Sequence, residues 1–344
     1  MKEQHEIISS KSLLDEKGDL LEPGWARKLL PVYRREDVKA GRLRLKEWDY
    51  YLITDGHIGL ALTIADNGYM GLDSISFLNF DEGWEKTKSP MRLLPMGKTK
   101  LPETSAEGAS EIAKGGYAMA FYHEDGVRKL TFHMDRFLGK DAIEGMIELS
   151  DEPDESMVIA TPFEKPAHFY YNRKINCMRA EGWIELGEKR FELTKDRFFA
   201  VLDWGRGVWT YHNTWYWGSA SGELDGVPFG WNIGYGFGNT EAASENVLFY
   251  DGRVHKLSDV SFNIPQKDGK DDFLSPWTFT SDDNRFYMDF TPVLDRASCT
   301  NFGVLKSNQH QVFGRFTGRI TLDDGTVLPV KEFFGFAEKV ENKW

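Results

Sequence analysis

The residues with the clearest chemical potential lie in the segment DWGRG, which begins at Asp203. Asp203 and Arg206 flank Gly205 and Gly207, and this spacing predicts a sharp bend that directs a carboxylate and a guanidinium into the mouth of a pocket. Asp203 would then act as an acid or base, and Arg206 would position the reacting molecule. An ion pair that only locks a loop would use the same two residues, so the structural interpretation stays open.

His212 and Glu245 are the next candidates. Histidine suits a general base because its ordinary pKa is close to neutrality. Successive strand residues face opposite sides, however, so His212 and the neighbouring tryptophans cannot line one simple cavity unless a bulge intervenes. Glu245 and Asn246 would add a carboxylate and an amide to the site, although solvated loop positions are the commoner setting for such residues.

Most of these residues belong to the aromatic segment 203–238, which holds five of the 11 tryptophans. Its alternation predicts a β-hairpin whose aromatic side chains form the wall of a cavity. Aromatic rows in β proteins are more often packed core than ligand wall, so both interpretations stay open. The predicted ligand-binding residues are Trp204, Trp209, Tyr211, Asn213, Trp215, Trp217, Trp231, Tyr235, Glu245 and Asn246.

Glycines alternate with the aromatic residues of the second predicted strand, from Gly230 to Gly238. Glycine weakens a strand unless another group must approach closely or the sheet must bend. We therefore predict that a backbone, a bulky side chain or a ligand presses on this glycine face.

Composition and charge exclude several classes of function. The chain has 344 residues, of which 41% are hydrophobic and 28% charged, as in globular proteins with a sizeable core. A formal net charge of -12 opposes binding to nucleic acid. No segment has the roughly 18 apolar residues of a membrane helix, and the N-terminal segment lacks the apolar core of a signal peptide. We therefore expect a cytoplasmic protein with no membrane span.

Motifs for common cofactors are missing from the sequence. It has no GxxxxGK phosphate loop, no GxGxxG between strand and helix, no HExxH pair and no zinc-type cysteine spacing. Cys177 and Cys299 are far apart and are expected to be reduced and buried. We expect no cofactor and no metal, and the aromatic segment points to a small hydrophobic molecule as the partner. The oligomeric state does not follow from the sequence.

Short strand-like runs bounded by Gly, Asp, Asn and Pro recur from about Leu43 to the C-terminus, whereas helical periodicity is scarce. This pattern predicts an all-β protein. Tight hairpin turns are predicted at Asp55-Gly56, Asp251-Gly252 and Asp324-Gly325.

Seven longer motifs are spread along the chain. They are GWAR at Gly24, KEWDYY at Lys46, FYYNRKINCM at Phe169, LDWGRGVWTYHNTWYWGSASG at Leu202, GWNIGYGFG at Gly230, SENVLFYDGRVHKL at Ser244 and HQVFGRFTG at His310. On these motifs the chain is identified as a member of an uncharacterised bacterial family, domain of unknown function 2804. More distantly, its length, all-β pattern and C-terminal hairpin resemble the two-calycin proteins, which include carotenoid hydratases and fungal pericyclase-type cyclases. The aspartate–histidine pattern of those hydratases is not cleanly present.

The second resemblance implies two lipocalin/calycin-like antiparallel β-barrels, one of which holds a hydrophobic substrate. An eight-stranded barrel is wide enough for one small ligand. The length also suggests two domains, which we place at residues 1–190 and 191–344. A large β-sandwich is the alternative, in which the aromatic residues form an inter-sheet core or a flat platform for sugar rings.

Three hypotheses about function follow. The first is binding of an apolar or amphipathic small molecule, extended by cofactor-free lyase or isomerase chemistry of the hydratase type, with Asp203, Arg206 and His212 as the catalytic candidates. The second is a non-catalytic carrier of lipid or pigment. The third is a carbohydrate-active or lectin-like protein in which tryptophans stack on sugars.

Overall fold

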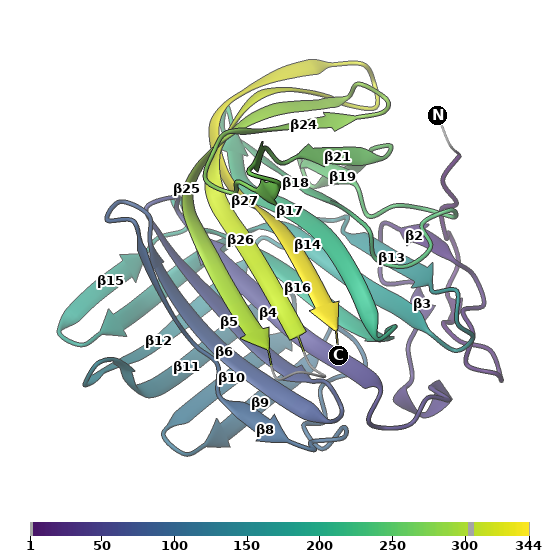
Figure 1. Cartoon of the computed structure of the whole chain (residues 1–344), viewed down its shortest axis with the longest axis horizontal. Coiled ribbons are helices and arrows are strands. Elements are labelled where there is room, and N and C mark those ends of the chain that lie inside the picture. Colours follow the sequence, from purple (N-terminus) through teal and green to yellow (C-terminus); the bar gives the residue numbers. More distant parts are fainter. Residues whose placement is uncertain (1–2, 302–305, 344) are drawn as a thin grey trace.

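The computed structural model describes residues 3–301 and 306–343 and confirms the predicted all-β class (Figure 1). A first sheet of 14 strands and a second sheet of nine strands make up most of the structure, and two small strand pairs accompany them. The helical element of the described residues is a single 3-10 turn, Arg35–Asp37. That part of the chain therefore includes no helix with the length and apolar character needed to cross a membrane.

The strands of the first sheet extend from the N-terminal region to Val208. They are β2 Gly24–Ala26, β4 Leu45–Thr54, β5 Ile58–Asp66, β6 Met70–Asn79, β7 Trp84–Lys88, β8 Met91–Leu93, β9 Gly108–Lys114, β10 Tyr117–Glu124, β11 Val127–Leu138, β12 Asp141–Ser150, β13 Met157–Pro162, β14 Phe169–Leu186, β15 Lys189–Leu193 and β16 Phe199–Val208.

The strands of the second sheet follow directly in the chain. They are β17 His212–Leu224, β18 Val227–Tyr235, β19 Val247–Tyr250, β20 Arg253–Lys256, β21 Val260–Asn263, β24 Trp277–Ser281, β25 Phe286–Asn301, β26 Lys306–Thr321 and β27 Val327–Lys343. The small pairs are β1 Lys11–Ser12 with β3 Pro31–Val32, and β22 Gln266–Lys267 with β23 Lys270–Asp271.

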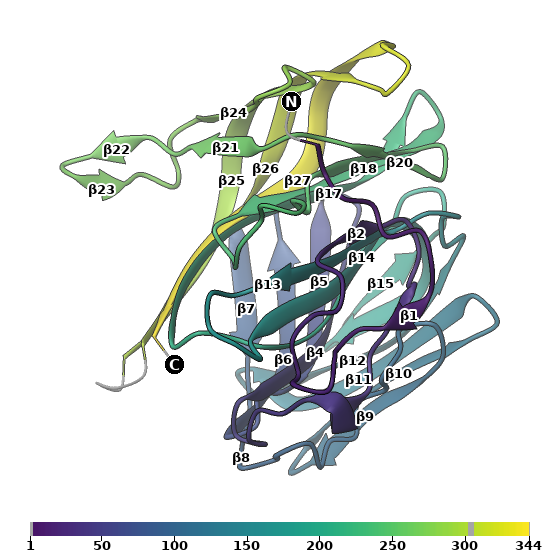
Figure 2. The same ribbon diagram turned by 90° about the vertical axis from the view of Figure 1, so that its right-hand side faces the viewer.

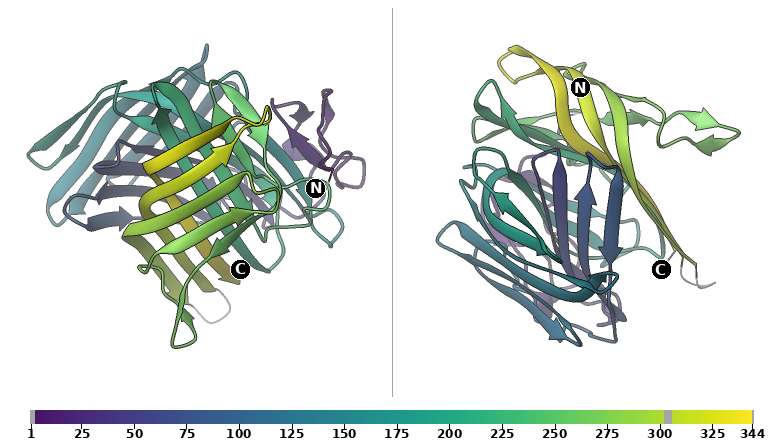
Figure 3. Two further views of the ribbon diagram at one scale, coloured as in Figure 1. Left: turned by 90° about the horizontal axis from the view of Figure 1, so that it is seen from above. Right: turned by 90° about the vertical axis from the view of Figure 1, so that its left-hand side faces the viewer.

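The architecture is a large antiparallel sheet combined with a second sheet that curls into a half-barrel. The first sheet runs from β7 to β9 through the central strands β4, β16 and β14, and the second runs from β20 to β21 through β18, β17 and β27. Figures 2 and 3 show the second sheet packed across the first. The chain changes sheets between Val208 and His212. A division into domains at residue 190 stays a prediction.

All three predicted Asp-Gly hairpin turns are confirmed. They connect β4 to β5, β19 to β20 and β26 to β27. Gly56 and Gly252 have positive φ angles of 81° and 74°, which glycine adopts without strain. Three further Asp-Gly turns, at residues 125–126, 225–226 and 268–269, close the β10–β11, β17–β18 and β22–β23 hairpins.

The predicted extent of the first strand of the aromatic hairpin is wrong. The segment 209–211 is a connection between β16 and β17, and Trp204 belongs to β16. Side chains stabilise this connection: the Thr210 hydroxyl donates to the carbonyl of His212 at 2.9 Å, and Asn213 Nδ2 donates to the carbonyl of Thr210 at 3.0 Å. Such local hydrogen bonds compete with strand pairing, which alternation alone does not reveal.

Each sheet has its own apolar core, and further apolar side chains meet between the sheets. Trp204 belongs to the core of the first sheet, and Trp231 belongs to the core of the second. Trp217 and Phe336 belong to a cluster that joins the sheets. Every residue of β16 is therefore buried, because one face of the strand covers the first core and the other meets the second sheet.

The two cysteines differ in environment. Cys177 is buried on β14, whereas Cys299 is exposed near the end of β25, and both are free thiols. The prediction of a buried residue is thus wrong for Cys299, because this end of β25 is exposed from Cys299 to Thr300.

Glycines make room for bulky groups that approach from a neighbouring strand or from the opposite sheet. A Cβ atom on Gly205 would lie 2.0 Å from the Trp48 indole. A Cβ atom on Gly230 would lie 3.0 Å from Cys177 Sγ of the first sheet. The predicted pressure on the glycine face is therefore confirmed, and in this structure the pressing groups belong to the protein itself.

We expect Gly205→Ala to lower the free energy of unfolding by about 1–3 kcal/mol, because the added methyl group overlaps the rigid Trp48 ring in a packed interface. Gly41→Ala is the matched control, since a Cβ atom there meets nothing within 4 Å. Urea unfolding followed by tryptophan fluorescence measures both variants. Equal stability of Gly205→Ala and Gly41→Ala would contradict the close contact.

Candidate functional site

A buried ion pair lies on the face of the first sheet that meets the second. Lys174 on β14 places Nζ 2.8 Å from Oδ2 of Asp203 on β16. The other carboxylate oxygen, Oδ1, accepts a hydrogen bond from Asn172 Nδ2 at 2.6 Å. All three residues are buried. Lys174 and Asp203 are direct partners across the two strands, so their side chains share one face.

The Trp217 indole of β17 covers this pair from the second sheet. Lys174 Nζ lies 4.0 Å from the centroid of the ring, a cation–π contact. Trp217 Nε1 donates to Asn232 Oδ1 at 2.8 Å, and Asn232 Nδ2 donates to the main-chain oxygen of Glu245 at 2.9 Å. A continuous series of contacts therefore joins Asp203 of the first sheet to Glu245 of the second.

The loop before β19 brings Glu245 to this position. Its carboxyl lies directly over Gly234, where a Cβ atom would be 2.7 Å from Glu245 Oε1. The next residue, Asn246, is buried and its Oδ1 accepts a hydrogen bond from the Gly234 N–H at 2.7 Å. Gly234 thus makes room for the carboxyl, and Asn246 holds the loop in place.

A third carboxyl group, Glu338 on β27, lies on the same face of the second sheet. Trp215 Nε1 donates to Glu338 Oε1 at 2.8 Å, and Gln309 Nε2 donates to Oε2 at 3.0 Å. We refer to the polar groups and the indole that gather here as the inter-sheet cluster. Its members are Asn172, Lys174, Asp203, Trp217, Asn232, Glu245 and Glu338.

Burial controls the charge of these carboxyl groups. It raises the pKa of Glu245, the Lys174 ammonium opposes this change, and the Asp203 charge adds to it. Burial likewise raises the pKa of Glu338, against the hydrogen bond from Trp215. Burial therefore shifts both glutamates toward the neutral carboxyl form, whereas Asp203 has the Lys174 ammonium as its direct counter-ion.

Aromatic rings continue the interface beside the cluster. We call Trp48, Tyr170, Trp209, Trp215 and Phe237 the aromatic corner. The Trp48 and Trp209 rings meet at 5.2 Å, and the Trp209 and Trp215 rings each contact Phe237. Trp48 and Trp215 are partly exposed, so the aromatic corner reaches solvent.

A small cavity of about 10 Å³ lies farther along the same interface. Leu52 and Val201 of the first sheet and Ser219 and Phe336 of the second contribute to its lining. This volume has room for about one water molecule. A larger ligand at the inter-sheet cluster therefore requires side chains or sheets to move apart.

The structure separates Asp203 from Arg206. β16 is regular through both residues, without the predicted bend, so that positions three apart face opposite sides. Arg206 is buried in the first sheet, where its guanidinium donates to Asp49 Oδ1 at 3.1 Å and to the carbonyl of Pro102 at 2.7 Å. The prediction that both residues enter one pocket mouth is wrong, because β16 has two buried faces.

The predicted aromatic wall is also divided. Trp217 pairs with Gly234 across the hairpin, so Trp231 and Tyr235 face the other side of the sheet. There Trp231 packs against Phe316 with ring centroids 5.1 Å apart, which is core packing. Trp204 lies in the core of the first sheet, apart from both Trp217 and Trp231.

The residues near the start of β17 lie apart from Asp203. His212 and Tyr211 are exposed and their rings contact each other at 5.1 Å, while Asn213 is partly buried. Trp209 is buried in the aromatic corner. Among the described residues, no hydrogen bond or ion pair joins His212 to Asp203. A catalytic role for His212 therefore stays a prediction without a geometric partner.

Four members of the inter-sheet cluster were not predicted from the sequence. These are Asn172, Lys174, Asn232 and Glu338. A signal exists for the first two, since Asn172, Lys174 and Asn176 are polar residues at alternate positions of FYYNRKINCM. Such a polar row on a buried strand indicates a polar face. Glu338 carries no comparable signal, because GFAEKV also suits a strand with one wet face.

Comparison with known proteins identifies the family. The chain belongs to the family described as Domain of unknown function (DUF2804), whose model matches residues 4–344. A search of curated proteins found no match. The match to the family model confirms the family resemblance expected from the motifs.

Two solved structures share the fold. The AttH-like protein of Nitrosomonas europaea is 10% identical, with a TM-score of 0.57, and the match covers 93% of this chain and 99% of that one. Kievitone hydratase from Nectria haematococca is 9% identical, with a TM-score of 0.50, and the match covers 96% and 98%. At this identity the likeness concerns the fold alone.

The raised pKa of Glu245 predicts a specific dependence of stability on pH. The folded protein binds this proton more tightly than the unfolded chain, so stability falls as pH rises from the ordinary glutamate pKa of 4.5 through the folded pKa. Glu245→Gln mimics the neutral carboxyl and removes this loss. We expect its advantage over the wild type in urea unfolding to be larger at pH 8 than at pH 5.

Glu241→Gln is the matched control, because Glu241 is exposed on the same loop. Its effect on the free energy of unfolding should be small at both pH values. An advantage of Glu245→Gln that does not change with pH would contradict burial of the carboxyl as the cause.

Proposed function

We propose that this protein binds an apolar or amphipathic small molecule between its two sheets, against the aromatic corner and the inter-sheet cluster. The observation that carries the proposal is the Lys174–Asp203 ion pair under the Trp217 ring, close enough to Glu245 to influence its pKa. Aromatic walls with a few oriented polar groups are typical of small-molecule sites. Binding requires the partly exposed Trp48 and Trp215 to move apart and admit the ligand.

We further propose cofactor-free addition or elimination of water as the reaction. In an elimination, the Asp203 carboxylate takes a proton from carbon, and Glu245 in its acid form gives a proton to the leaving hydroxyl, which departs as water. Hydration is the reverse. A carboxylate paired with an ammonium group and a carboxyl whose pKa is raised by burial can divide the roles of base and acid.

The fold likeness supports this class of reaction as a hypothesis. Kievitone hydratase is by its name a hydratase and shares the arrangement of sheets. We propose that the two sheets correspond to the paired lipocalin-like units of the two-calycin proteins. A non-catalytic carrier would use the same aromatic walls and would leave Asp203 and Glu245 without a chemical role.

The first experiment is native mass spectrometry of the purified protein, followed by organic extraction of any bound molecule. We expect a stoichiometric adduct of an apolar or amphipathic compound, taken up during expression or from an added panel of fatty acids, polyenes and hydroxylated aromatic compounds. Trp217→Ala should weaken the adduct because it removes the ring over Lys174. A ligand-free mass under all of these conditions would contradict the proposal.

The extracted molecule then tests the chemistry. We expect Asp203→Asn to abolish conversion, but it also leaves the Lys174 ammonium without its counter-ion, at a cost of about 3–5 kcal/mol. The double variant Asp203→Asn with Lys174→Met avoids this cost and should retain binding without turnover. Conversion at the wild-type rate by the folded double variant would remove Asp203 from the mechanism and favour another base.

A further inference from the structure

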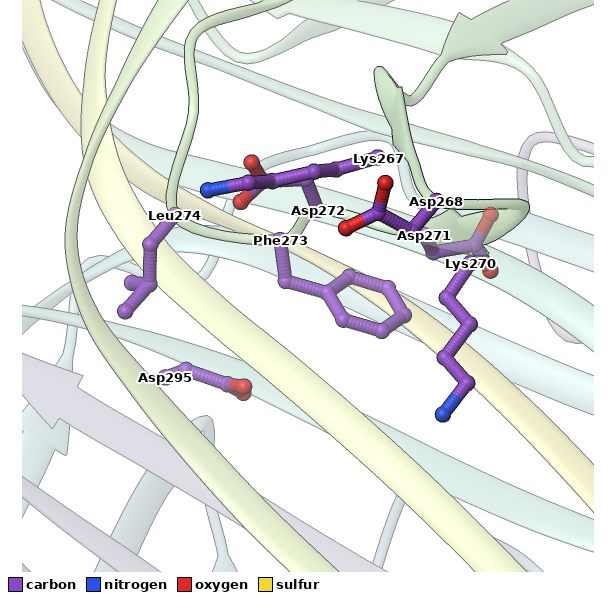
Figure 4. A pocket seen from close by; sticks show the side chains of 8 residues that line it. All are labelled: Lys267, Asp268, Lys270, Asp271, Asp272, Phe273, Leu274 and Asp295. Atoms are coloured by element: carbon purple, nitrogen blue, oxygen red, sulfur yellow. The ribbon is translucent and has the colours of Figure 1, made fainter.

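A second candidate site lies on the other face of the second sheet, beneath the projecting β22–β23 hairpin (Figures 2 and 4). An open cavity of about 530 Å³ is present here. Its lining residues are Lys267, Asp268, Lys270, Asp271, Asp272, Phe273, Leu274 and Asp295. Seven of them come from the hairpin and the segment that follows it, and Asp295 comes from β25.

This cavity is separate from the inter-sheet cluster. His310 of β26 and Lys339 of β27 lie next to the cavity, and each is adjacent in sequence to a residue that faces the first sheet, Gln311 and Glu338. Adjacent strand residues point to opposite sides. The second sheet therefore separates the cavity from Asp203.

Phe273 is held as a rigid platform within the cavity. Its ring stacks on the His310 imidazole with centroids 3.9 Å apart and an angle of 14° between the planes. His310 Nδ1 in turn lies 2.7 Å from Asp295 Oδ2. The hairpin is fastened at a second point, because Lys339 Nζ lies 2.6 Å from Asp271 Oδ2. Figure 4 shows Phe273 between Leu274 and Lys270, with Asp295 opposite the hairpin.

Some charged side chains around this platform have a hydrogen-bond or ion-pair partner among the described residues of the protein, and others do not. Asp271 is paired with Lys339, and Asp272 Oδ2 accepts a hydrogen bond from the Ser275 hydroxyl at 2.9 Å. Within residues 3–301 and 306–343, the side chains of Lys267, Lys270 and Asp268 have no recorded hydrogen bond or ion pair. The cavity therefore offers two ammonium donors and the Asp268 carboxylate, beside the fixed Asp295 carboxylate and one aromatic face.

We propose that this cavity binds a neutral saccharide. Vicinal hydroxyl groups both donate and accept, so they can satisfy ammonium donors and carboxylate acceptors together. The C–H face of a sugar ring packs on an aromatic platform, here Phe273. The lining combines ammonium and carboxylate groups, so neither an apolar surface nor a single ionic group matches all of it. The wide opening to solvent suits a ligand that stays partly hydrated.

The test is saturation-transfer-difference NMR of the full-length protein with glucose, galactose, mannose, xylose, maltose and cellobiose. We expect transfer to at least one of these sugars, with Phe273→Ala weakening binding about tenfold, the effect of losing roughly 1.4 kcal/mol of aromatic contact. Phe273→Trp keeps the platform and should retain binding. Asp203→Asn with Lys174→Met alters only the inter-sheet cluster and should bind the sugar as the wild type does.

Leu274→Trp is a second variant, and it should fold normally because Leu274 is 62% exposed. The larger side chain narrows the cavity beside Phe273 and should weaken transfer even if Phe273→Ala fails to fold. No transfer from the wild type to any of the six sugars would overturn the proposal, as would unchanged binding in folded Leu274→Trp. Loss of sugar binding in the inter-sheet double variant alone would assign the sugar to the inter-sheet cluster and also overturn it.

Discussion

Burial of the Lys174 ammonium is the constraint on which the contact between the two sheets depends. An ammonium group removed from water costs several kcal/mol unless a counter-ion and further polar contacts compensate it. Asp203 provides the counter-ion, and Trp217 provides a ring 4.0 Å away. Trp217 is then oriented by Asn232, which also contacts Glu245. One buried charge on β14 thus determines which residues are acceptable on β16, on β17 and β18, and in the loop before β19.

The position of β14 against the second sheet is fixed by an irregularity in that strand. Its register with β16 shifts between Ile175 and Met178, and Cys177 has a φ of 64°, a conformation that costs energy for a residue with a side chain. The bulge brings Asn176 Nδ2 within 3.0 Å of the Ala220 carbonyl and 3.1 Å of the Trp231 carbonyl. These hydrogen bonds hold the bulge against two neighbouring strands of the second sheet and help to offset the strain at Cys177.

Local signals in the sequence predicted the fold class, the hairpin turns and the pressure on the glycines, because each depends on a few adjacent residues. Asp-Gly turns need only two residues, and Gly234 indicates a close approach without naming the approaching group. The inter-sheet cluster could not be predicted in the same way, since Lys174, Asp203 and Glu338 meet through strand order and through the packing of one sheet on the other. The division of the aromatic wall follows from register, which pairs Trp217 with Gly234 and so turns Trp231 to the opposite face.

The hydrogen bonds of the inter-sheet cluster bear on the proposal that a ligand enters between the two sheets. Lys174, Asp203 and Asn172 bond to one another within the first sheet. The indoles of Trp217 and Trp215 bond to Asn232 and Glu338 within the second sheet. Separation at this end would break aromatic and cation–π contacts and leave these polar groups paired. It would also break the hydrogen bond that the Asn239 N–H donates to the Pro162 carbonyl at 2.7 Å. At Asn176 the hydrogen bonds cross from one sheet to the other, so that end of the interface resists separation. The proposed ligand binding requires opening at the aromatic corner, whereas the hydrogen bonds of Asn176 oppose opening at the bulge of β14.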